Sequence, residues 1–274
     1  MKRKRDTPED DTQDAQIARW KRLRRVNIQA ELESIVGEGA TFRGKQEEVI
    51  TKIMHHASPI LVVMGTGAGK SLLYQLPAHS QKSGTTVVVV PLKALEHDSH
   101  ARCVKAGISS IMWDSSQADR MAQVVFVQPE SAVSVRFGNY LNRLEGLGQL
   151  DRVVIDECHT VLQSRPDFRP RMRDAGAVLK DRGKQMVFLT ATLSPAKEEE
   201  FWQAMHMPPV PCIRDITSRR NIRYSVYEYE RQMDEMVAVG ALIRQKLEQY
   251  PMPAKMIIYS SSISTIQALS LIHI

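Results

Sequence analysis

The sequence predicts an α/β fold built on a doubly wound parallel sheet. Short apolar runs rich in Val and Ile recur between residues 60 and 189, and stretches with helical spacing separate them. The runs do not alternate apolar with polar residues, which is typical of strands that helices cover on both faces. A glycine-rich stretch follows the first run directly, as expected where a strand passes through a phosphate-binding turn into a helix.

Length and composition limit the class of protein. The 274 residues suffice for one large domain, or for one domain and part of a second. A hydrophobic content of 43% and a charged content of 25% are typical of a globular protein. No apolar run approaches the ~20 residues that cross a bilayer. The 3 cysteines are too widely spaced for a zinc motif and predict a reducing compartment. The net charge of +6 suits a polyanionic partner but does not identify it.

Two segments precede the first strand. Residues 1–14 mix the basic run Lys2–Arg5 with acidic residues and contain almost nothing apolar, so we expect a disordered tail. The basic run is either a nuclear localisation signal, which predicts a nuclear protein, or a solvated basic tail. Over residues 15–40 the apolar side chains have helical spacing up to Val36, which predicts one N-terminal helix. Its basic residues are expected on a solvated face: Arg19, Lys21, Arg22, Arg24 and Arg25.

The main domain is expected over residues 41–208. Its strands are predicted at 60–64, 86–90, 124–127, 153–155 and 186–189, with room for crossover helices between them. A Pro-rich stretch at 207–211 predicts a domain boundary. Beyond it, strand-like runs at 222–229 and 256–259 flank a helical stretch at 233–249. These runs predict the start of a second α/β unit over 209–268.

A phosphate site is predicted at the first strand. The strand leads into a glycine-rich loop and then a helical stretch, the order that a P-loop requires. The loop residues are Gly65, Thr66, Gly67, Ala68, Gly69, Lys70 and Ser71. Glycines let successive backbone N–H groups face phosphate oxygens, and the helix start adds a partial positive charge. Lys70 is expected to neutralise the β- and γ-phosphates, and Ser71 to ligate Mg²⁺.

A pair of carboxylates follows the predicted strand that ends at Ile155. Asp156 and Glu157 therefore stand at the carboxyl edge of the sheet, where such folds bind ligands. We expect Asp156 to hold Mg²⁺, directly or through water, and Glu157 to orient and deprotonate the attacking water. His159 is expected to relay the state of the nucleotide, because no other His or Cys stands at metal-ligand spacing.

Residues 41–262 resemble superfamily two helicases, and the RecQ family in particular. Phe42-Arg43 with Gln46 is similar to the RecQ motif, whose Gln reads the N6/N7 edge of adenine. Residues 64–78 are similar to motif I, and Thr190-Ala191-Thr192 to motif III, which couples hydrolysis to strand separation. The resemblance implies a P-loop NTPase of RecA-like fold with ATP and Mg²⁺ as cofactors. It assigns catalysis to Lys70, Asp156, Glu157, His159, Thr190 and Thr192, and nucleotide binding to Arg43, Gln46 and residues 65–71.

Three further segments resemble motifs that contact DNA. Residues 90–95 are similar to motif Ia, and 128–131 to the Thr-Pro-Glu segment on the DNA backbone. Such contacts position a strand without reading its sequence. Residues 163–170 resemble the aromatic-rich loop that senses single-stranded DNA, although Ser164 and Pro166 replace the family's usual Trp and His. The implied nucleic-acid residues are Pro91, Lys93, Gln128, Pro129, Glu130, Phe168 and Arg169.

The C-terminal region resembles the entry into a second RecA-like lobe at 221–224 and motif IV at 257–262. No segment resembles motifs V and VI, whose arginine contributes ~10³ to 10⁵ in rate in related ATPases. We therefore expect nucleotide binding with weak hydrolysis and inefficient unwinding. The last residues, 269–274, resemble a translated sequencing adapter, and a natural apolar terminus is the alternative.

The family resemblance implies an ATP-dependent 3′–5′ DNA helicase that acts on single-stranded or forked DNA in repair or recombination. The amino-acid sequence of residues 43–46 and 156–162 is most similar to that of RecQ-like helicase domains of fungi, some of them telomere-linked. Two alternatives remain open. One is an RNA helicase of the DEAD-box or DEAH-box kind, and the other is a non-catalytic fragment that binds ATP and nucleic acid.

Overall fold

The computed structural model describes residues 8–163, 171–218, 221–228, 230, 232–250 and 253–271. The chain divides into two compact units, Met1–Arg219 and Arg220–Ile274, which are described separately.

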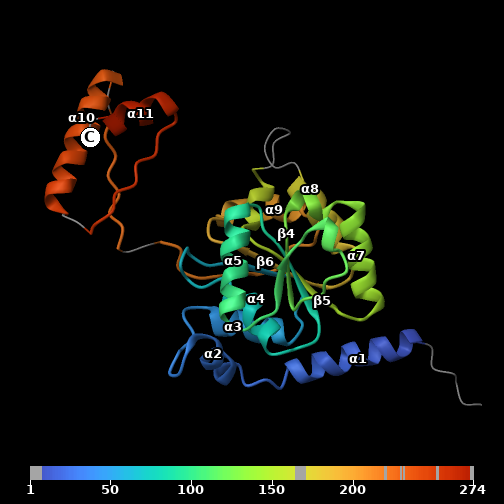
Figure 1. Ribbon diagram of the computed structural model, residues 1–274. Coiled ribbons are helices and arrows are strands. Elements are labelled where there is room, and N and C mark those ends of the chain that lie inside the picture. The colour runs from blue at the N-terminus through green and yellow to red at the C-terminus, as the bar shows by residue number, and fades with distance from the viewer. Residues whose placement is uncertain are drawn as a thin grey trace, which may run out of the picture. The chain divides into compact units, whose positions relative to one another are not determined.

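The first unit is built on a parallel sheet (Figure 1). Its seven strands follow the order β3-β4-β2-β5-β6-β1-β7. The strands are β1 (Ile60–Val63), β2 (Thr85–Val89), β3 (Ser110–Met112), β4 (Val124–Val127), β5 (Leu150–Ile155), β6 (Gln185–Thr190) and β7 (Cys212–Arg214). The five strands predicted from the sequence are confirmed. The edge strands β3 and β7 were not predicted.

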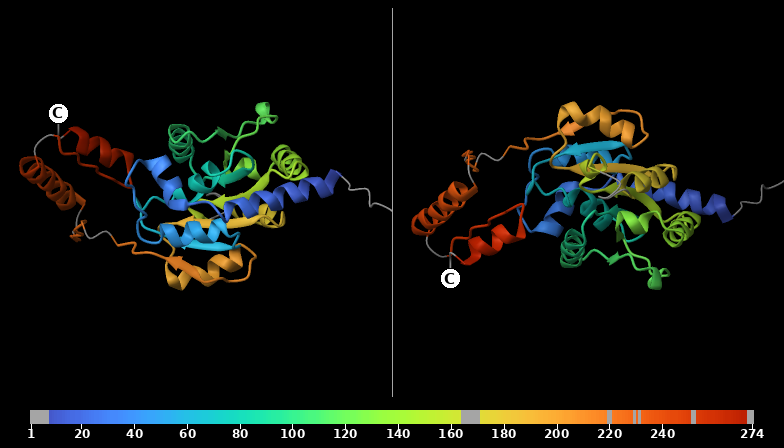
Figure 2. Two further views of the ribbon diagram at one scale, coloured as in Figure 1. Left: turned by 90° about the horizontal axis from the view of Figure 1, so that it is seen from below. Right: turned by 90° about the horizontal axis from the view of Figure 1, so that it is seen from above.

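Helices cover both faces of this sheet (Figure 2). Successive residues of a strand contribute to opposite cores: Leu61 and Val63 to one, Val62 to the other. This double burial explains the lack of alternation in the apolar runs. One face is covered by α2 (Ile28–Val36), α3 (Gln46–Met54), α4 (Leu72–His79) and α5 (Lys93–Lys105). The other is covered by α6 (Pro129–Ala132), α7 (Val135–Gly146), α8 (Arg171–Lys180) and α9 (Glu198–Ala204).

The N-terminal region differs from the prediction in two respects. Helix α1 (Pro8–Leu23) begins inside the segment expected to be disordered, and residues 24–27 divide the single predicted helix into α1 and α2. A proline at the first helical position, followed by acidic residues, favours a helix start at Pro8. The side chain of Asn27 then accepts hydrogen bonds from the backbone N–H groups of Gln29 and Ala30 and caps α2.

Arg19 does not lie on a solvated face. It is only 4% exposed, and its guanidinium lies 2.6 Å from a carboxylate oxygen of Asp151, at the start of β5. The same group donates to the carbonyl oxygen of Gly148. Leu23 is also buried. These contacts dock α1 at the amino ends of the strands, at the bottom of Figure 1.

The predicted boundary after residue 208 is wrong. Beyond the Pro-rich stretch, β7 pairs in parallel with β1, with Cys212 opposite Leu61 and Arg214 opposite Val63. The Asp215 N–H donates to the Val63 carbonyl oxygen at 2.9 Å. The first unit therefore extends to Arg219, because the Pro-rich stretch leads into one more strand of the same sheet.

The second unit contains α10 (Gln232–Gln249) and α11 (Ile263–Leu271). The predicted helix at 233–249 is confirmed. The runs predicted as strands at 222–229 and 256–259 form no ladder among the described residues, and Val226 is 86% and Tyr259 88% exposed. Residues 269–271 of the adapter-like segment belong to α11, and 272–274 lie outside the described residues.

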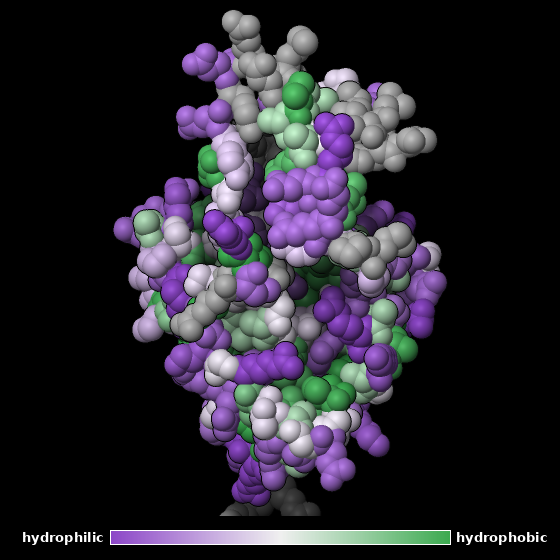
Figure 3. Space-filling view, turned by 90° about the vertical axis from the view of Figure 1, so that its left-hand side faces the viewer, coloured by the Kyte–Doolittle hydropathy of each residue, from purple (hydrophilic) through white to green (hydrophobic). Residues whose placement is uncertain are grey.

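Hydrophilic side chains cover most of the face drawn in Figure 3, with apolar side chains in small patches between them. Within the described parts of the chain, none of the helices combines the length and apolar character needed to span a bilayer.

Candidate functional site

The glycine-rich loop lies between β1 and α4, at the carboxyl edge of the sheet. Gly67 has a φ of +83° and Gly69 one of +76°, a region that glycine adopts without strain. A Cβ atom on Gly69 would lie 2.5 Å from Nε2 of Gln46, so a side chain there would displace the Gln46 amide. Thr66 is exposed and Ser71 precedes the first residue of α4. The predicted strand, loop and helix are therefore all present.

Gln46 connects this loop to the segment before α3. Its side chain is nearly fully buried, at 4% exposure. Nε2 donates to the carbonyl oxygen of Ala68 at 2.8 Å, and Oε1 accepts from the Arg43 N–H at 2.9 Å. The two segments predicted to bind nucleotide are thus joined through one amide group.

Asp215 directly follows β7, holds the same segment and was not predicted. Its Oδ2 accepts a hydrogen bond from the Lys45 N–H at 3.1 Å, and its Oδ1 accepts from the Ile216 N–H at 2.7 Å. A Cβ atom on Gly44 would lie 1.9 Å from Oδ2. The carboxylate therefore packs directly against the backbone of Gly44, beside Gln46.

The two acidic residues follow β5, at the same edge as the loop. Asp156 accepts a hydrogen bond at Oδ1 from the Glu157 N–H at 2.9 Å. Glu157 has φ 47° and ψ 45°, a left-handed conformation that is uncommon for a residue with a side chain. Its Oε1 lies 4.0 Å from Nζ of Lys70, which also donates to the Met64 carbonyl oxygen at 3.3 Å. The fold thus brings the loop lysine and Glu157 together.

The two carboxylates differ in their electrostatics. Burial, and then the charge of Glu157, raise the pKa of Asp156 to about 6. The pKa of Glu157 is lowered, because His159 hydrogen-bonds its carboxylate and Lys70 adds positive charge. A buried carboxylate with a raised pKa gains most from a nearby cation, and hydroxyl and carboxylate oxygens are ligands that Mg²⁺ prefers. Ser71 and Asp156 therefore fit the metal that the sequence predicts.

His159 bridges the acidic pair and the end of β6. Its Nδ1 lies 2.8 Å from Oγ1 of Thr190 and 3.4 Å from Oε2 of Glu157. Thr190 is fully buried, and its Oγ1 accepts a hydrogen bond from the Thr192 N–H at 3.2 Å. Contacts therefore run without interruption from Lys70 through Glu157 and His159 to the end of β6.

The residues predicted to contact nucleic acid lie at the carboxyl ends of the neighbouring strands β2 and β4. Lys93 and Glu130 are exposed, whereas Pro129 is buried. Gln128 donates from Nε2 to Oε2 of Glu96, a buried residue of α5, at 2.8 Å, and so links the two segments. Pro91 is half-buried. Phe168 and Arg169 lie outside the described residues.

A parallel sheet with a glycine-rich loop after β1 and an Asp-Glu pair after β5 defines a P-loop NTPase. Residues 43–201 match the family model described as DEAD/DEAH box helicase. The chain belongs to this family.

Similarity to individual proteins points in the same direction. The chain is 32% identical over 228 residues to "ATP-dependent DNA helicase Q-like 2" of Arabidopsis thaliana, covering 76% of this chain and 31% of that protein. It is 34% identical over 220 residues to "ATP-dependent DNA helicase Q5" of Mus musculus, covering 74% and 22%. The chain thus spans only about a fifth to a third of these relatives.

Solved structures share the fold at low sequence identity. The helicase MrfA bound to DNA superimposes with a TM-score of 0.65 at 18% identity, over 89% of this chain and 37% of that one. The DEAD-box helicase Mss116, solved with single-stranded RNA, superimposes with a TM-score of 0.55 at 16% identity, over 80% and 50%. These likenesses support the predicted RecA-like architecture.

Proposed function

We propose that this chain is the ATP-binding part of a RecQ-type DNA helicase, which couples ATP binding and hydrolysis to 3′–5′ movement on single-stranded DNA. The observation that carries the proposal is the continuous contact from Lys70 through Glu157 and His159 to Thr190. It joins the phosphate site to the end of β6, the segment that resembles motif III. Two relatives that the chain resembles are named as DNA helicases.

Each residue of the site has a distinct part in the proposed hydrolysis. Lys70 neutralises the β- and γ-phosphates, and Ser71 and Asp156 would hold Mg²⁺, which neutralises phosphate charge when bound. Glu157 has a lowered pKa and is therefore ionised at neutral pH, so it can accept a proton from the attacking water. His159 contacts both Glu157 and Thr190, so a change in the bonding of Glu157 reaches β6.

We further propose that residues 1–274 hydrolyse ATP weakly when isolated. No segment of the sequence resembles motifs V and VI, which supply an arginine to the ATP site in the family. An arginine of this kind raises the rate of hydrolysis ~10³- to 10⁵-fold in related ATPases. Measurement of phosphate release over hours tests this proposal, with the Glu157→Gln variant as the control that does not hydrolyse ATP. A turnover above ~1 s⁻¹, the lower end for typical enzymes, would contradict it.

An RNA helicase is the second candidate, because one structure with the same fold was solved with single-stranded RNA. The two candidates are separated by affinity for DNA and RNA strands of equal length and sequence, measured with a non-hydrolysable ATP analogue at fixed salt. The proposed DNA helicase should bind the DNA strand more tightly, and the 2′-hydroxyl is the group by which a protein distinguishes the two strands. Tighter binding to RNA would overturn the proposed DNA substrate.

We also propose that the protein is nuclear, from the basic run Lys2–Arg5. A fluorescent fusion with these four residues changed to alanine is expected to lose nuclear accumulation. Unchanged nuclear accumulation would remove the basis for this assignment.

A further inference from the structure

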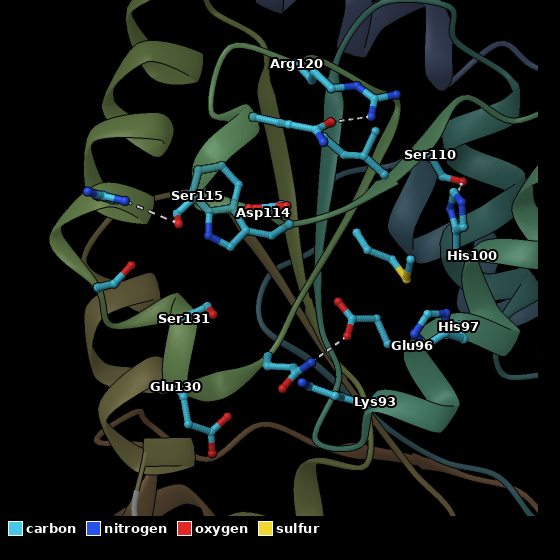
Figure 4. A pocket seen from close by; sticks show the side chains of 17 residues that line it. Lys93, Glu96, His97, His100, Ser110, Asp114, Ser115, Arg120, Glu130 and Ser131 are labelled. Atoms are coloured by element: carbon cyan, nitrogen blue, oxygen red, sulfur yellow. Dashed lines mark hydrogen bonds between the residues drawn. The ribbon is translucent and has the colours of Figure 1, made fainter.

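A pocket of ≈ 790 Å³ opens at the carboxyl ends of β3 and β4 (Figure 4). Figure 4 shows Lys93 and Glu96 on its α5 side, and Ser115 and Ser131 on the opposite side. None of the described residues of the glycine-rich loop or the Asp-Glu pair lines it. The pocket is therefore separate from the nucleotide site.

Trp113 forms part of the pocket wall. Its backbone N–H donates to the Phe126 carbonyl oxygen at 2.8 Å, which fixes the chain directly after β3. Its ring packs on Phe137, with centroids 4.9 Å apart and planes at 74°, and on Tyr140, at 4.8 Å and 45°. Both partners are buried in the core, whereas Trp113 is only half-buried. The core thus holds the ring in place, and the residue lines the pocket while it stays partly exposed.

The pocket has no excess of positive charge. Three basic and three acidic side chains line it, the histidines apart: Lys93, Arg120, Arg136, Glu96, Asp114 and Glu130. A pocket that recognised phosphate alone would carry net positive charge. A held aromatic ring among balanced donors and acceptors instead suits a flat, uncharged ligand with polar edges. A nucleobase has this chemistry, and any base can stack on an aromatic face.

Two side chains at the rim are available to such a ligand. Lys93 and Glu130 are exposed, and neither forms a hydrogen bond or ion pair with another described residue. Gln128 and Glu96 instead bond to each other and form a fixed part of the wall. The pocket therefore offers one cation and one carboxylate in addition to the aromatic ring.

We propose that this pocket seats one unpaired base of the nucleic-acid strand, stacked on Trp113. The inference rests on the proposed binding of a single strand across the starts of α5 and α6. It requires an unpaired base, because the faces of bases within a duplex are covered by their neighbours.

The test compares binding of a labelled ten-thymidine strand with binding of an abasic strand of the same length. Trp113→Leu removes the aromatic face and keeps an apolar side chain. We expect it to weaken binding of the thymidine strand by about 5- to 150-fold and to leave the abasic strand unaffected. Trp113→Phe should retain most of the affinity. The matched control is Trp20→Leu, since Trp20 lies on α1, packs against His56 and does not line the pocket.

The outcomes separate this inference from the proposed function. If the wild-type chain binds neither strand, both fail. If it binds both strands equally, or if Trp113→Leu weakens both equally, nucleic-acid binding stands and the base pocket is refuted. A second measurement does not depend on folding of the leucine variant. In Trp20→Phe, tryptophan fluorescence should be quenched by the thymidine strand and not by the abasic one, because Trp202 is 2% exposed. Absence of quenching would also refute the pocket.

Discussion

Replacing Asp215 by alanine is expected to weaken ATP binding, although this residue is not part of any nucleotide-binding motif. Its Oδ2 accepts the Lys45 N–H at 3.1 Å and lies where a Cβ atom on Gly44 would be. Lys45 is the N-cap of α3, whose first residue is Gln46. The carboxylate therefore holds the segment that presents Gln46 and places a negative charge at the positive end of a helix.

The size of the effect follows from these two contributions. A hydrogen bond to a charged group is worth ~1.5 to 3 kcal/mol, and a charge at a helix terminus ~0.3 to 1 kcal/mol. Because Asp215 is half-buried, we take the lower ends, which sum to about 2 kcal/mol and correspond to ~30-fold in affinity. Asp215→Asn keeps an acceptor oxygen and loses only the charge, so its loss should be ~2- to 5-fold.

Titration with labelled ATP and GTP measures both effects. If Gln46 reads adenine, Asp215→Ala should lower ATP affinity toward that of GTP and leave GTP affinity nearly unchanged. Asp119→Ala serves as the control, because Asp119 is 99% exposed and pairs with Arg143 on the surface. An ATP affinity within twofold of the wild type would refute the reasoning. Equal losses for ATP and GTP would indicate a disturbed P-loop instead.

Three further predictions follow from the structure. Lys70→Ala should abolish nucleotide binding, whereas Glu157→Gln should keep binding and lose hydrolysis. Titration with labelled ATP measures the binding, and phosphate release measures the hydrolysis. Unchanged ATP affinity in Lys70→Ala would refute the phosphate site. Arg19→Ala leaves Asp151 as an unpaired charge where both side chains are 5% exposed, so urea denaturation should show a loss of ~3 to 5 kcal/mol. A loss below ~1 kcal/mol would be incompatible with the docked α1. Burial lowers the pKa of His56 to about 4 from 6.5, so the unfolded chain binds more protons between these values. Stability should therefore fall as pH decreases from 6.5 to 4, by on the order of 2 kcal/mol after allowance for the partly exposed ring, and less so in His56→Asn. Equal pH dependence in the two chains would contradict this assignment.

The central strands could be predicted because each is a continuous apolar run buried on both faces. The edge strands could not. β3 and β7 are 3 residues long, and each has a single buried residue, Ile111 and Ile213. In the second unit, residues 256–259 are as apolar as the strands of the first unit, and residues 222–229 alternate apolar and polar side chains in part. A ladder also needs a neighbouring strand, and local sequence does not reveal whether one is within reach.

The candidate site was predictable where its residues belong to compact segments. The glycine-rich loop and the Asp-Glu pair each follow a recognisable strand, and parallel strands end at a common edge. Asp215 was not predictable, because only the pairing of β7 brings it to Gly44. Arg19 was not predictable either, since its burial depends on Asp151, more than a hundred positions later in the chain.

β7 gives the nucleotide site a mechanical connection. The chain leaves the sheet toward the second unit from this strand, and β7 is paired along its length with β1. Tension on the segment that follows Arg214 would act on the hydrogen bonds that pair β7 with β1. The backbone hydrogen bond that follows the β7–β1 ladder joins Asp215 to Val63, two residues ahead of Gly65. A force on the chain after β7 would therefore act on β1, directly before the phosphate-binding loop. A rigid loop would in turn hold β1 and β7 more firmly in place.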